Sequence, residues 1–336
     1  MTATGRSPVR SPAIAIWAGL LILYLVWGST YLGIRIAIET IPPLLMAGFR
    51  FLLAGGILYA ISIARGEVAV RPSLAEWRDA TIVGALLMVG GMGLVALGEQ
   101  TVPSGIAALL VAVMPVWLAI VGRVAFGQRL PLAVVAGIAL GLAGVAILAW
   151  PAGADGLEPL GVLALIASPL SWAIGSLFVA HRARLPRSSL LGTAMQMLAG
   201  GVLLTILGLA RGELTDLRLG EISVESIVAV AYLTFIGSLL AFTVFGWLVR
   251  VAPLSLIGTY AYVNPVVAVL LGAVFVAEPI TPRTIVAAVV IVVAVAIIVT
   301  ARGRMSRAGA PANPGRETPD PERRVADVRP PEPEAA

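Results

Sequence analysis

The 336-residue sequence contains no cysteine, no lysine and a single histidine, His181. The absence of cysteine excludes disulfide bonds, thiolate nucleophiles and thiolate metal sites. A metal site built around one histidine would need mostly carboxylates, and carboxylates are scarce inside the apolar runs of this chain. We therefore predict that the protein holds neither a metal ion nor another cofactor.

Charged residues are also few. They make up 12% of the sequence, against 59% for hydrophobic residues. Because a soluble protein needs a charged surface, this balance indicates a membrane protein. The basic residues other than His181 are all arginines, and they concentrate in loops and tails, where they suit anionic lipid headgroups as partners. The net charge of +5 is therefore no sign of nucleic-acid binding.

Long apolar runs are what the sequence has in abundance. A helix of about 20 apolar residues crosses the hydrocarbon core of a bilayer, and ten runs approach this length. The first run follows Arg6 and Arg10, but it is too long for a signal peptide and lacks a convincing cleavage site, so we expect it to be retained. The sequence thus predicts an all-α membrane protein with ten transmembrane helices. Their predicted ranges are residues 14–34, 44–64, 79–98, 102–124, 131–150, 159–180, 189–210, 225–248, 254–276 and 284–301.

Arginines in the predicted loops indicate the orientation. Cytoplasmic loops of membrane proteins carry an excess of arginine and lysine. If both termini are cytoplasmic, most loop arginines fall on the cytoplasmic side, and a miscount by one span would break the alternation. The arginine-only, alanine- and valine-rich composition is typical of a bacterial genome of high GC content, so we predict a multi-pass protein of the bacterial inner membrane. The four arginines of the predicted outer loops are Arg35, Arg211, Arg218 and Arg283.

The ends of the chain differ in character from the apolar region. Residues 1–13 form a short polar tail, and residues 302–336 are rich in proline, glutamate, arginine and alanine. The C-terminal segment cannot bury a core, so we predict that it is disordered. A regulatory or lipid-contacting tail is the alternative.

The apolar region contains an internal repeat. One nearly constant offset places Trp27 on Trp172 and the segment 53–56 on the segment 198–201, while a slightly larger offset places Pro115 on Pro265. The chain therefore divides into a first repeat, residues 14–150, and a second repeat, residues 159–301. Because each repeat has five predicted spans, an odd number, the second must lie inverted relative to the first. Inverted repeats that meet at a midplane site are common in secondary transporters, although channels and some receptors also contain repeats.

Arg50 is the sharpest candidate for a binding residue. It lies several residues inside the second predicted span, where an ionisable side chain is costly and is by default a functional hypothesis. Its guanidinium could clamp a substrate carboxylate or phosphate. The alternative is a structural arginine that reaches the interface or bonds backbone carbonyls.

Aromatic and hydroxyl side chains occur at a similar depth. Trp27, Thr30 and Tyr31, together with Trp172 in the second repeat, could line the path of a solute. Helix packing is the alternative, because small residues such as Gly28 let helices approach closely while tryptophan fills the groove.

Two prolines fall near the centres of predicted spans four and nine. Pro115 and Pro265 each remove a backbone donor and are expected to bend their helices, which frees a carbonyl for solute or water. Asn264 precedes Pro265, and Tyr260 lies one turn upstream, so an amide and a phenol are available as solute contacts. The alternative is a kink that only shapes packing, with Asn264 bonded to the freed carbonyl.

Three glutamates lie nearest the membrane: Glu39, Glu99 and Glu278. A proton-coupled transporter could use one of them as its carrier. All three fall at predicted outer ends of spans, however, where a solvated carboxylate needs no special explanation. We therefore expect them to be ordinary surface residues.

The motifs resemble those of a known family. Trp27 to Tyr31, then Pro42 and Pro43, then Ala47 to Phe51 resemble the first repeat of EamA-type transporters of the drug/metabolite transporter superfamily. Pro265, Gly272 and the segment Ala277 to Thr281 resemble the end of the family's second repeat. Pro115, Gly122 and the segment Phe126 to Leu130 resemble the corresponding part of its first repeat.

This resemblance implies ten helices in two inverted five-helix repeats and export of small metabolites or drugs. It places the cavity between the first four helices of each repeat, and it makes spans five and ten peripheral or dimer-contacting, so a homodimer is one expectation. Gln128 stands where a glutamate is common, and Pro279 stands where an arginine or lysine is usual. The resemblance therefore does not assign ion coupling to Glu278.

We accordingly predict a secondary transporter that exports small amino-acid-like or amphipathic metabolites by alternating access. A sensor or a passive channel is the alternative. An intramembrane enzyme is disfavoured, because no aspartate lies in the interior of a predicted span and no Ser–His or histidine-rich metal pattern occurs. No catalytic residue is predicted, and ATP-driven transport is disfavoured by the lack of a glycine-rich phosphate loop.

Overall fold

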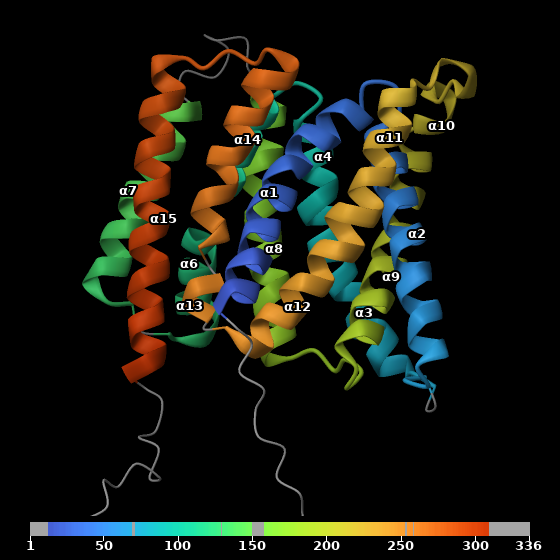
Figure 1. Cartoon of the computed structure of the whole chain (residues 1–336), viewed down its shortest axis with the longest axis horizontal. Helices are drawn as coiled ribbons and strands as arrows, with labels where there is room; N and C mark the ends of the chain where they lie inside the picture. Colours follow the sequence, from blue (N-terminus) through green and yellow to red (C-terminus); the bar gives the residue numbers. More distant parts are fainter. Residues whose placement is uncertain are drawn as a thin grey trace, which may run out of the picture.

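The computed structural model describes residues 13–68, 71–128, 130–149, 158–252, 254–257 and 259–308. These residues form helices and connecting loops, with no strand among them, which confirms the all-α prediction (Figure 1). Eight helical segments are long and apolar enough to cross a membrane, and two shorter apolar helices accompany them. The two shorter helices cover residues Leu132–Leu148 and Tyr260–Val276.

The first half of the chain contains these elements: α1 (Ala13–Ala37), α2 (Pro43–Ala64), α3 (Leu74–Gly84), the π-helix η1 (Ala85–Gly93), α4 (Leu94–Gly98), α5 (Ser104–Val111), α6 (Met114–Phe126) and α7 (Leu132–Ala149). The second half contains α8 (Pro159–His181), α9 (Ser189–Ala210), α10 (Glu213–Asp216), the short 3₁₀-helix η2 (Leu219–Glu221), α11 (Val224–Tyr232), the π-helix η3 (Leu233–Leu240), α12 (Ala241–Val251), α13 (Leu254–Ile257), α14 (Tyr260–Val276) and α15 (Pro282–Ala308).

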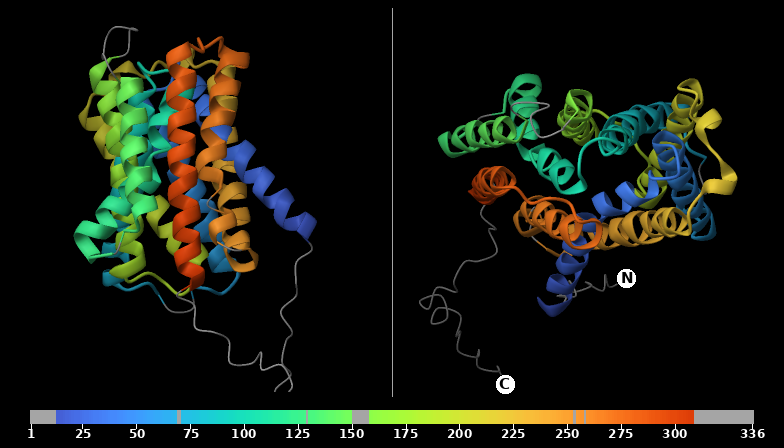
Figure 2. Two further views of the ribbon diagram at one scale, coloured as in Figure 1. Left: turned by 90° about the vertical axis from the view of Figure 1, so that its left-hand side faces the viewer. Right: turned by 90° about the horizontal axis from the view of Figure 1, so that it is seen from above.

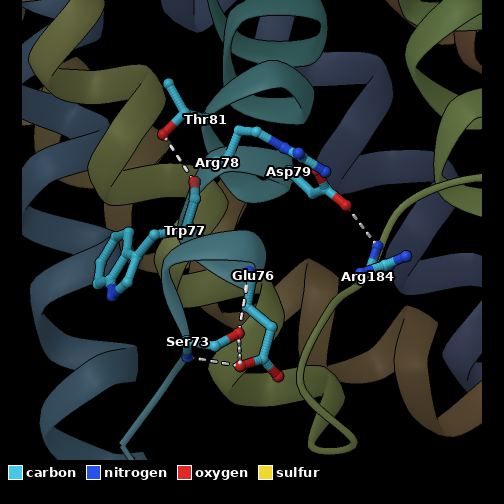
Figure 3. A network of polar contacts seen from close by, with 7 residues as sticks. All are labelled: Ser73, Glu76, Trp77, Arg78, Asp79, Thr81 and Arg184. Atoms are coloured by element: carbon cyan, nitrogen blue, oxygen red, sulfur yellow. Dashed lines mark hydrogen bonds and ion pairs between the residues drawn. The ribbon is translucent and has the colours of Figure 1, made fainter.

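Local sequence explains where several helices begin. Proline occupies the first turn of α2 and of α8, where a missing N–H costs nothing. At α3, the Ser73 hydroxyl accepts a hydrogen bond from the Glu76 N–H, and the Glu76 carboxylate accepts from the Ser73 N–H (Figure 3). This reciprocal pair is a capping box, which satisfies two backbone donors that the helix itself cannot pair.

The helices form one elongated bundle (Figures 1 and 2). At one edge α2 packs along α9, and at the opposite edge α7 packs along α15. Between these pairs, α1 contacts α11, α12 and α14, whereas α8 contacts η1, α4 and α6. Below, the upper end of the bundle means the end that carries the connection between α1 and α2, drawn at the top of Figure 1.

Glycines set the close packing of α2 on α9. A Cβ atom built on Gly55 would lie 2.9 Å from the Leu198 backbone nitrogen, and one built on Gly201 would lie 2.9 Å from the Leu52 nitrogen. These distances leave no room for a side chain, so the two backbones meet directly. The paired glycines belong to the repeated segments 53–56 and 198–201 of the sequence.

The connections after α6 and α14 share one geometry. Gly127 and Ala277 both adopt positive φ, at 63° and 53°. The next residue in each case, Gln128 or Glu278, donates its N–H to a glycine carbonyl six residues back, at 3.2 and 3.1 Å. The motif that the sequence repeats therefore also recurs as a backbone conformation.

Several spans are irregular. The third and eighth apolar segments each contain a π-helix, η1 and η3, and π-helical segments occur frequently at functional sites. The fourth segment is broken at Ala112 and Val113, so Pro115 lies in the first turn of α6 rather than in the middle of a bent helix. Pro265 lies inside α14, near its start at Tyr260.

The C-terminal boundary differs from the prediction. We expected disorder from residue 302, but α15 continues to Ala308. Arginine, alanine and methionine are good helix formers, which explains why the last helix extends beyond its apolar part. The predicted N-terminal tail, up to residue 12, and residues 309–336 lie outside the described residues.

Candidate functional site

Arg50 is buried between the two halves of the bundle. Its side chain is 3% exposed, and its Nε donates a hydrogen bond to the Ser238 hydroxyl in η3, at 3.1 Å. Its Cζ lies 5.0 Å from the centroid of the Phe51 ring. Among the described residues, no carboxylate forms an ion pair with this guanidinium. A buried cation without an anionic partner is strongly destabilising unless a ligand or water supplies one.

Thr30 lies beside Arg50 at Gly237 of η3. A Cβ built on Gly237 would lie 3.2 Å from Thr30 Cγ2 and 3.6 Å from Arg50 Nη2, so both side chains contact this glycine. The Thr30 hydroxyl donates to the Trp27 carbonyl of its own helix at 2.6 Å. Its methyl group faces η3, and the oxygen keeps a lone pair for a further donor.

Trp27 belongs to an aromatic cluster at the α1, α12 and α14 contact. Its ring centroid lies 5.0 Å from that of Tyr260, 5.4 Å from Phe245 and 5.7 Å from Phe242. The Trp27 and Tyr260 rings meet edge to face, at 78°. Such pairs are favourable beyond the apolar area that they bury.

Tyr31 lies one turn after Trp27 on α1, nearer the upper end of the bundle. Tyr31 is partly buried against the core that surrounds Val102 and Ala107.

Asn264 carries a buried acceptor without a partner. Its side chain is 9% exposed, and its Oδ1 has no hydrogen bond. The Asn264 carbonyl lies 3.1 Å from a Cβ built on Gly28, which shows how closely α14 and α1 approach there. An unpaired buried acceptor is costly, so a donor on a ligand or a water molecule would be favourable at this place.

Trp172 packs at a different place from the predicted site residues above. A Cβ built on Gly91 of η1 would lie 2.6 Å from Trp172 Cε3, so the ring packs on the first-repeat π-helix. The neighbouring Ser171 hydroxyl donates to the Leu86 carbonyl, also in η1, at 2.8 Å. The structure thus brings Arg50 and Thr30 together, joins Trp27 to Tyr260, and leaves Trp172 on the other π-helix.

Two of the three glutamates are not the solvated residues that we expected. Glu99 is fully buried, whereas Glu39 is exposed as predicted. The Glu278 carboxylate accepts hydrogen bonds from the N–H groups of Ser104, at 2.6 Å, and Gly105, at 2.9 Å. The prediction failed because Glu278 contacts the start of α5 and Glu99 is enclosed by the folded bundle, which the position of each residue within its own span does not reveal.

A cavity of about 500 Å³ lies at the upper end of the bundle, between the α1–α2 connection and the segment around α10. Glu213, Arg211 and Arg218 line it, and none of the predicted site residues does. The Glu213 carboxylate accepts from the N–H groups of Leu44 and Leu45 at the start of α2, at 3.0 and 2.9 Å. Burial raises the pKa of this carboxyl, and those two N–H groups oppose the shift.

Sequence reasoning missed Ser238, Phe242 and Phe245, which complete the surroundings of Arg50 and Trp27. Glu213 carried a usable signal, because the motif Arg211, Gly212, Glu213 repeats the motif 65–67. The serine and the phenylalanines carried none, since such residues are common in apolar helices.

Long apolar helices that enclose an arginine, a tyrosine and an amide define a polytopic helical membrane protein with polar groups in its interior. Residues 14–150 and 159–300 match the EamA-like transporter family, and the chain belongs to this family. The resemblance to EamA-type transporters of the drug/metabolite transporter superfamily is thereby confirmed.

Several relatives bear similar names. The chain is 41% identical over 261 residues to the "uncharacterized inner membrane transporter YedA" of Escherichia coli (strain K12), covering 77% of this chain and 82% of the relative. It is 28% identical over 286 residues to a "probable amino-acid metabolite efflux pump" of Salmonella typhimurium (strain LT2), covering 81% and 90%. A solved crystal structure of another protein chain is 25% identical, with a TM-score of 0.59, and the match covers 88% of this chain and 99% of that one.

Proposed function

We propose that the protein is an inner-membrane secondary transporter that exports small amino-acid-like or amphipathic metabolites by alternating access. Arg50 binds an anionic group of the cargo, and Thr30 and Asn264 offer hydrogen-bonding atoms. Trp27, Tyr31, Trp172 and Tyr260 supply apolar and aromatic surface, and Pro115 and Pro265 shape the helices around it. The observation that carries the proposal is the buried Arg50 guanidinium without a carboxylate partner among the described residues.

Helix packing supports two inverted five-helix repeats. The pairs α2 with α9 and α7 with α15 join equivalent spans of the two halves. The contacts of α1 with the eighth and ninth apolar segments are matched by contacts of α8 with the third and fourth. Such an exchange of partners is what a pseudo-two-fold axis in the membrane plane produces.

Polar contacts at the two ends repeat in the same way. At the upper end, Glu213 accepts from backbone N–H groups at the start of α2. At the lower end, its repeat counterpart Glu67 accepts from the hydroxyl of Ser188, the residue that caps α9. These contacts tie one repeat to the other at both ends, and breaking one set at a time would open one end at a time.

A second lower-end contact is made by Asp79 of α3. The Asp79 carboxylate accepts from the Arg184 N–H at 2.7 Å and pairs with the Arg78 guanidinium at 2.8 Å (Figure 3). Asp79 is 1% exposed, so its charge depends on these partners. This contact holds the connection between α8 and α9 against the first repeat.

The orientation and the cargo class have separate support. Arginine-rich loops favour cytoplasmic termini, which places the upper end outside the cell. The printed names of relatives, an inner membrane transporter and an amino-acid metabolite efflux pump, are consistent with inner-membrane export. A homodimer through α7 and α15 remains a prediction.

The experiment compares export by wild type, Arg50→Ala and Arg71→Ala in a bacterial host that lacks its main metabolite exporters. Arg71 is exposed in the connection before α3, so its variant controls for the loss of one arginine. After membrane levels have been matched, the medium is profiled by mass spectrometry. We expect one class of anionic solute to accumulate with wild type and Arg71→Ala, and not with Arg50→Ala.

Other outcomes separate the alternatives. Equal export by Arg50→Ala would make Arg50 structural while leaving the transporter function intact. A medium unchanged by wild type would contradict export and direct the test to uptake or sensing. Flux that rises linearly with concentration, without saturation, would identify a passive channel.

A further inference from the structure

Glu99 is a buried carboxyl that the cargo site does not use. It follows the last residue of α4 and is 0% exposed. Neither of its carboxyl oxygens has a hydrogen-bond partner. No other carboxyl group of the described residues has both oxygens buried and unpaired.

The cation nearest to Glu99 is engaged elsewhere. Arg35 of α1 donates from Nη1 to the backbone carbonyl of Glu99, at 2.7 Å, and to that of Gln100, at 3.4 Å. It satisfies carbonyls at the end of α4 and leaves the carboxyl without an ion pair. The preceding residue, Gly98, packs closely on α8, because a Cβ built on it would lie 2.6 Å from Leu165 Cγ.

The titratable groups that act on Glu99 come from two elements. Arg35 and Tyr31 lie one turn apart on α1, and Glu278 lies in the connection between α14 and α15. The Glu278 carboxylate accepts hydrogen bonds from the first N–H groups of α5. Burial raises the pKa of Glu99 well above its ordinary value, the charge of Glu278 adds to the shift, and Arg35 opposes it.

This environment excludes an ionised Glu99 while the upper end is closed. A carboxylate without hydrogen bonds in an apolar surrounding is far more costly than the neutral acid. Two like charges, Glu99 and Glu278, would also repel each other. Because Glu99 is 0% exposed, water can reach its carboxyl group only if the elements around the end of α4 move apart.

We propose that Glu99 is a proton-binding site that controls the upper end of the transporter. The carboxyl holds a proton while this end is closed. When the end opens, the O–H bond breaks, the proton passes to water, and the carboxylate becomes hydrated. The inference rests on the proposed alternating access. It implies that a low pH on the upper side favours the closed state of the upper end.

The proton is detected by infrared difference spectroscopy of the full-length protein in liposomes. We expect the carbonyl stretch of a protonated carboxylic acid near neutral pH in wild type, its loss in Glu99→Gln, and its retention in Glu39→Gln, the exposed control. If Glu99→Gln does not fold, Glu99→Met removes the same group. A spectrum in which the band is absent from wild type, or survives removal of Glu99, would overturn the proposal.

Opening is measured separately, on a chain that has no natural cysteine. Val102, three residues after Glu99, is 0% exposed, and its neighbour Thr101 is exposed. A membrane-impermeant maleimide is reacted with Val102→Cys, and the rate is divided by that of Thr101→Cys to remove the pH dependence of the thiol. Because opening is coupled to ionisation of Glu99, we expect the ratio of the two labelling rates to rise by up to about tenfold per pH unit.

The same ratio should be flat with pH when Glu99→Gln is added. A rise that persists without Glu99 would show that another group opens this end and would refute the assignment. Neither measurement needs the cargo. A protein that exports nothing yet shows both signals would overturn the proposed function alone, and an exporter without them would overturn only the role of Glu99.

Discussion

The Arg50 guanidinium of α2 and the Ser238 hydroxyl of η3 are joined by a buried hydrogen bond of 3.1 Å that links the first repeat to the second. The serine uses one of the five donors of the guanidinium. It therefore orients the charge without neutralising it. An arginine held in this way is preorganised for an anion, because little rotamer freedom remains to be lost on binding.

Removal of the orienting hydroxyl should weaken cargo binding and leave the fold intact. Hydrogen bonds to charged groups contribute about 1.5–3 kcal/mol, so Ser238→Ala is expected to raise the KM for export at least about tenfold. The measurement is concentration-dependent export in proteoliposomes once the cargo is known. Thr243→Ala is the control, because Thr243 is exposed and bonds its own helix. An unchanged KM in Ser238→Ala would show that Arg50 is positioned by other groups.

Asn264 distinguishes a binding role from a structural one. Replacing Asn264, whose buried Oδ1 is unpaired, by leucine removes a desolvation cost of about 1–3 kcal/mol. We therefore expect Asn264→Leu to be at least as stable to heat as wild type, yet impaired in export. Lower thermal stability would instead show that the amide has structural partners, and full export would show that cargo does not need it.

The glycine contact between α2 and α9 is expected to be intolerant of a single methyl group. In Gly55→Ala the new Cβ would lie 2.9–3.1 Å from backbone and Cβ atoms of α9 that cannot move easily, so we expect a loss of about 1–3 kcal/mol in the free energy of unfolding. Gly56→Ala is the matched control, because nothing lies within 4 Å of its Cβ position. There alanine should stabilise the helix by about 1 kcal/mol. Thermal unfolding of the two variants side by side tests this, and equal stability would contradict the close packing.

The carboxylate of Glu213 should stabilise the start of α2. It accepts from two N–H groups that the helix cannot pair, and its negative charge lies at the positive end of the helix dipole. Glu213→Ala is expected to lower the free energy of unfolding by about 1–2 kcal/mol, and Glu213→Gln by less, because the amide oxygen still accepts. Glu221→Ala serves as the control, since its carboxylate pairs only with an exposed arginine. If Glu213→Ala and Glu221→Ala have the same free energy of unfolding, the Glu213 carboxylate does not stabilise the start of α2.

Glu99 predicts how stability depends on pH. Its pKa in the folded state is raised above the ordinary value of about 4.5, so between these two values the unfolded chain has lost a proton that the folded protein keeps. The unfolded state then binds fewer protons, and the free energy of unfolding falls as pH rises, by up to about 1.36 kcal/mol per pH unit. Thermal melts across this range should show the decline in wild type and a weaker one in Glu99→Gln. Parallel curves for the two proteins would contradict burial of an ionisable Glu99.

Much of the architecture follows from local pattern. The apolar runs predicted most spans, because the thickness of hydrocarbon fixes the length that a helix needs. The repeated segments 53–56 and 198–201 marked the helix pair that packs most closely, since only glycine permits such an approach. Arg50 could be singled out because charge is rare in a span, and the structure buries it.

Other features required the fold. Within the sequence, Pro115 marked an irregular fourth span, but the actual break at Ala112 and Val113 depends on neighbouring helices that tolerate it. The expectation of a solvated Glu99 was wrong, because its burial depends on how the helices pack around the end of α4.

By itself the sequence determined the membrane-spanning helical class and the family, since hydropathy and motif spacing are properties of consecutive residues. Only the tertiary structure decided that Arg50 contacts Ser238, that Glu278 caps α5 and that the Glu99 carboxyl group has no hydrogen-bond partner. Those outcomes join residues far apart in the chain. Their physical cause is the packing of helices from opposite repeats, which no single segment encodes.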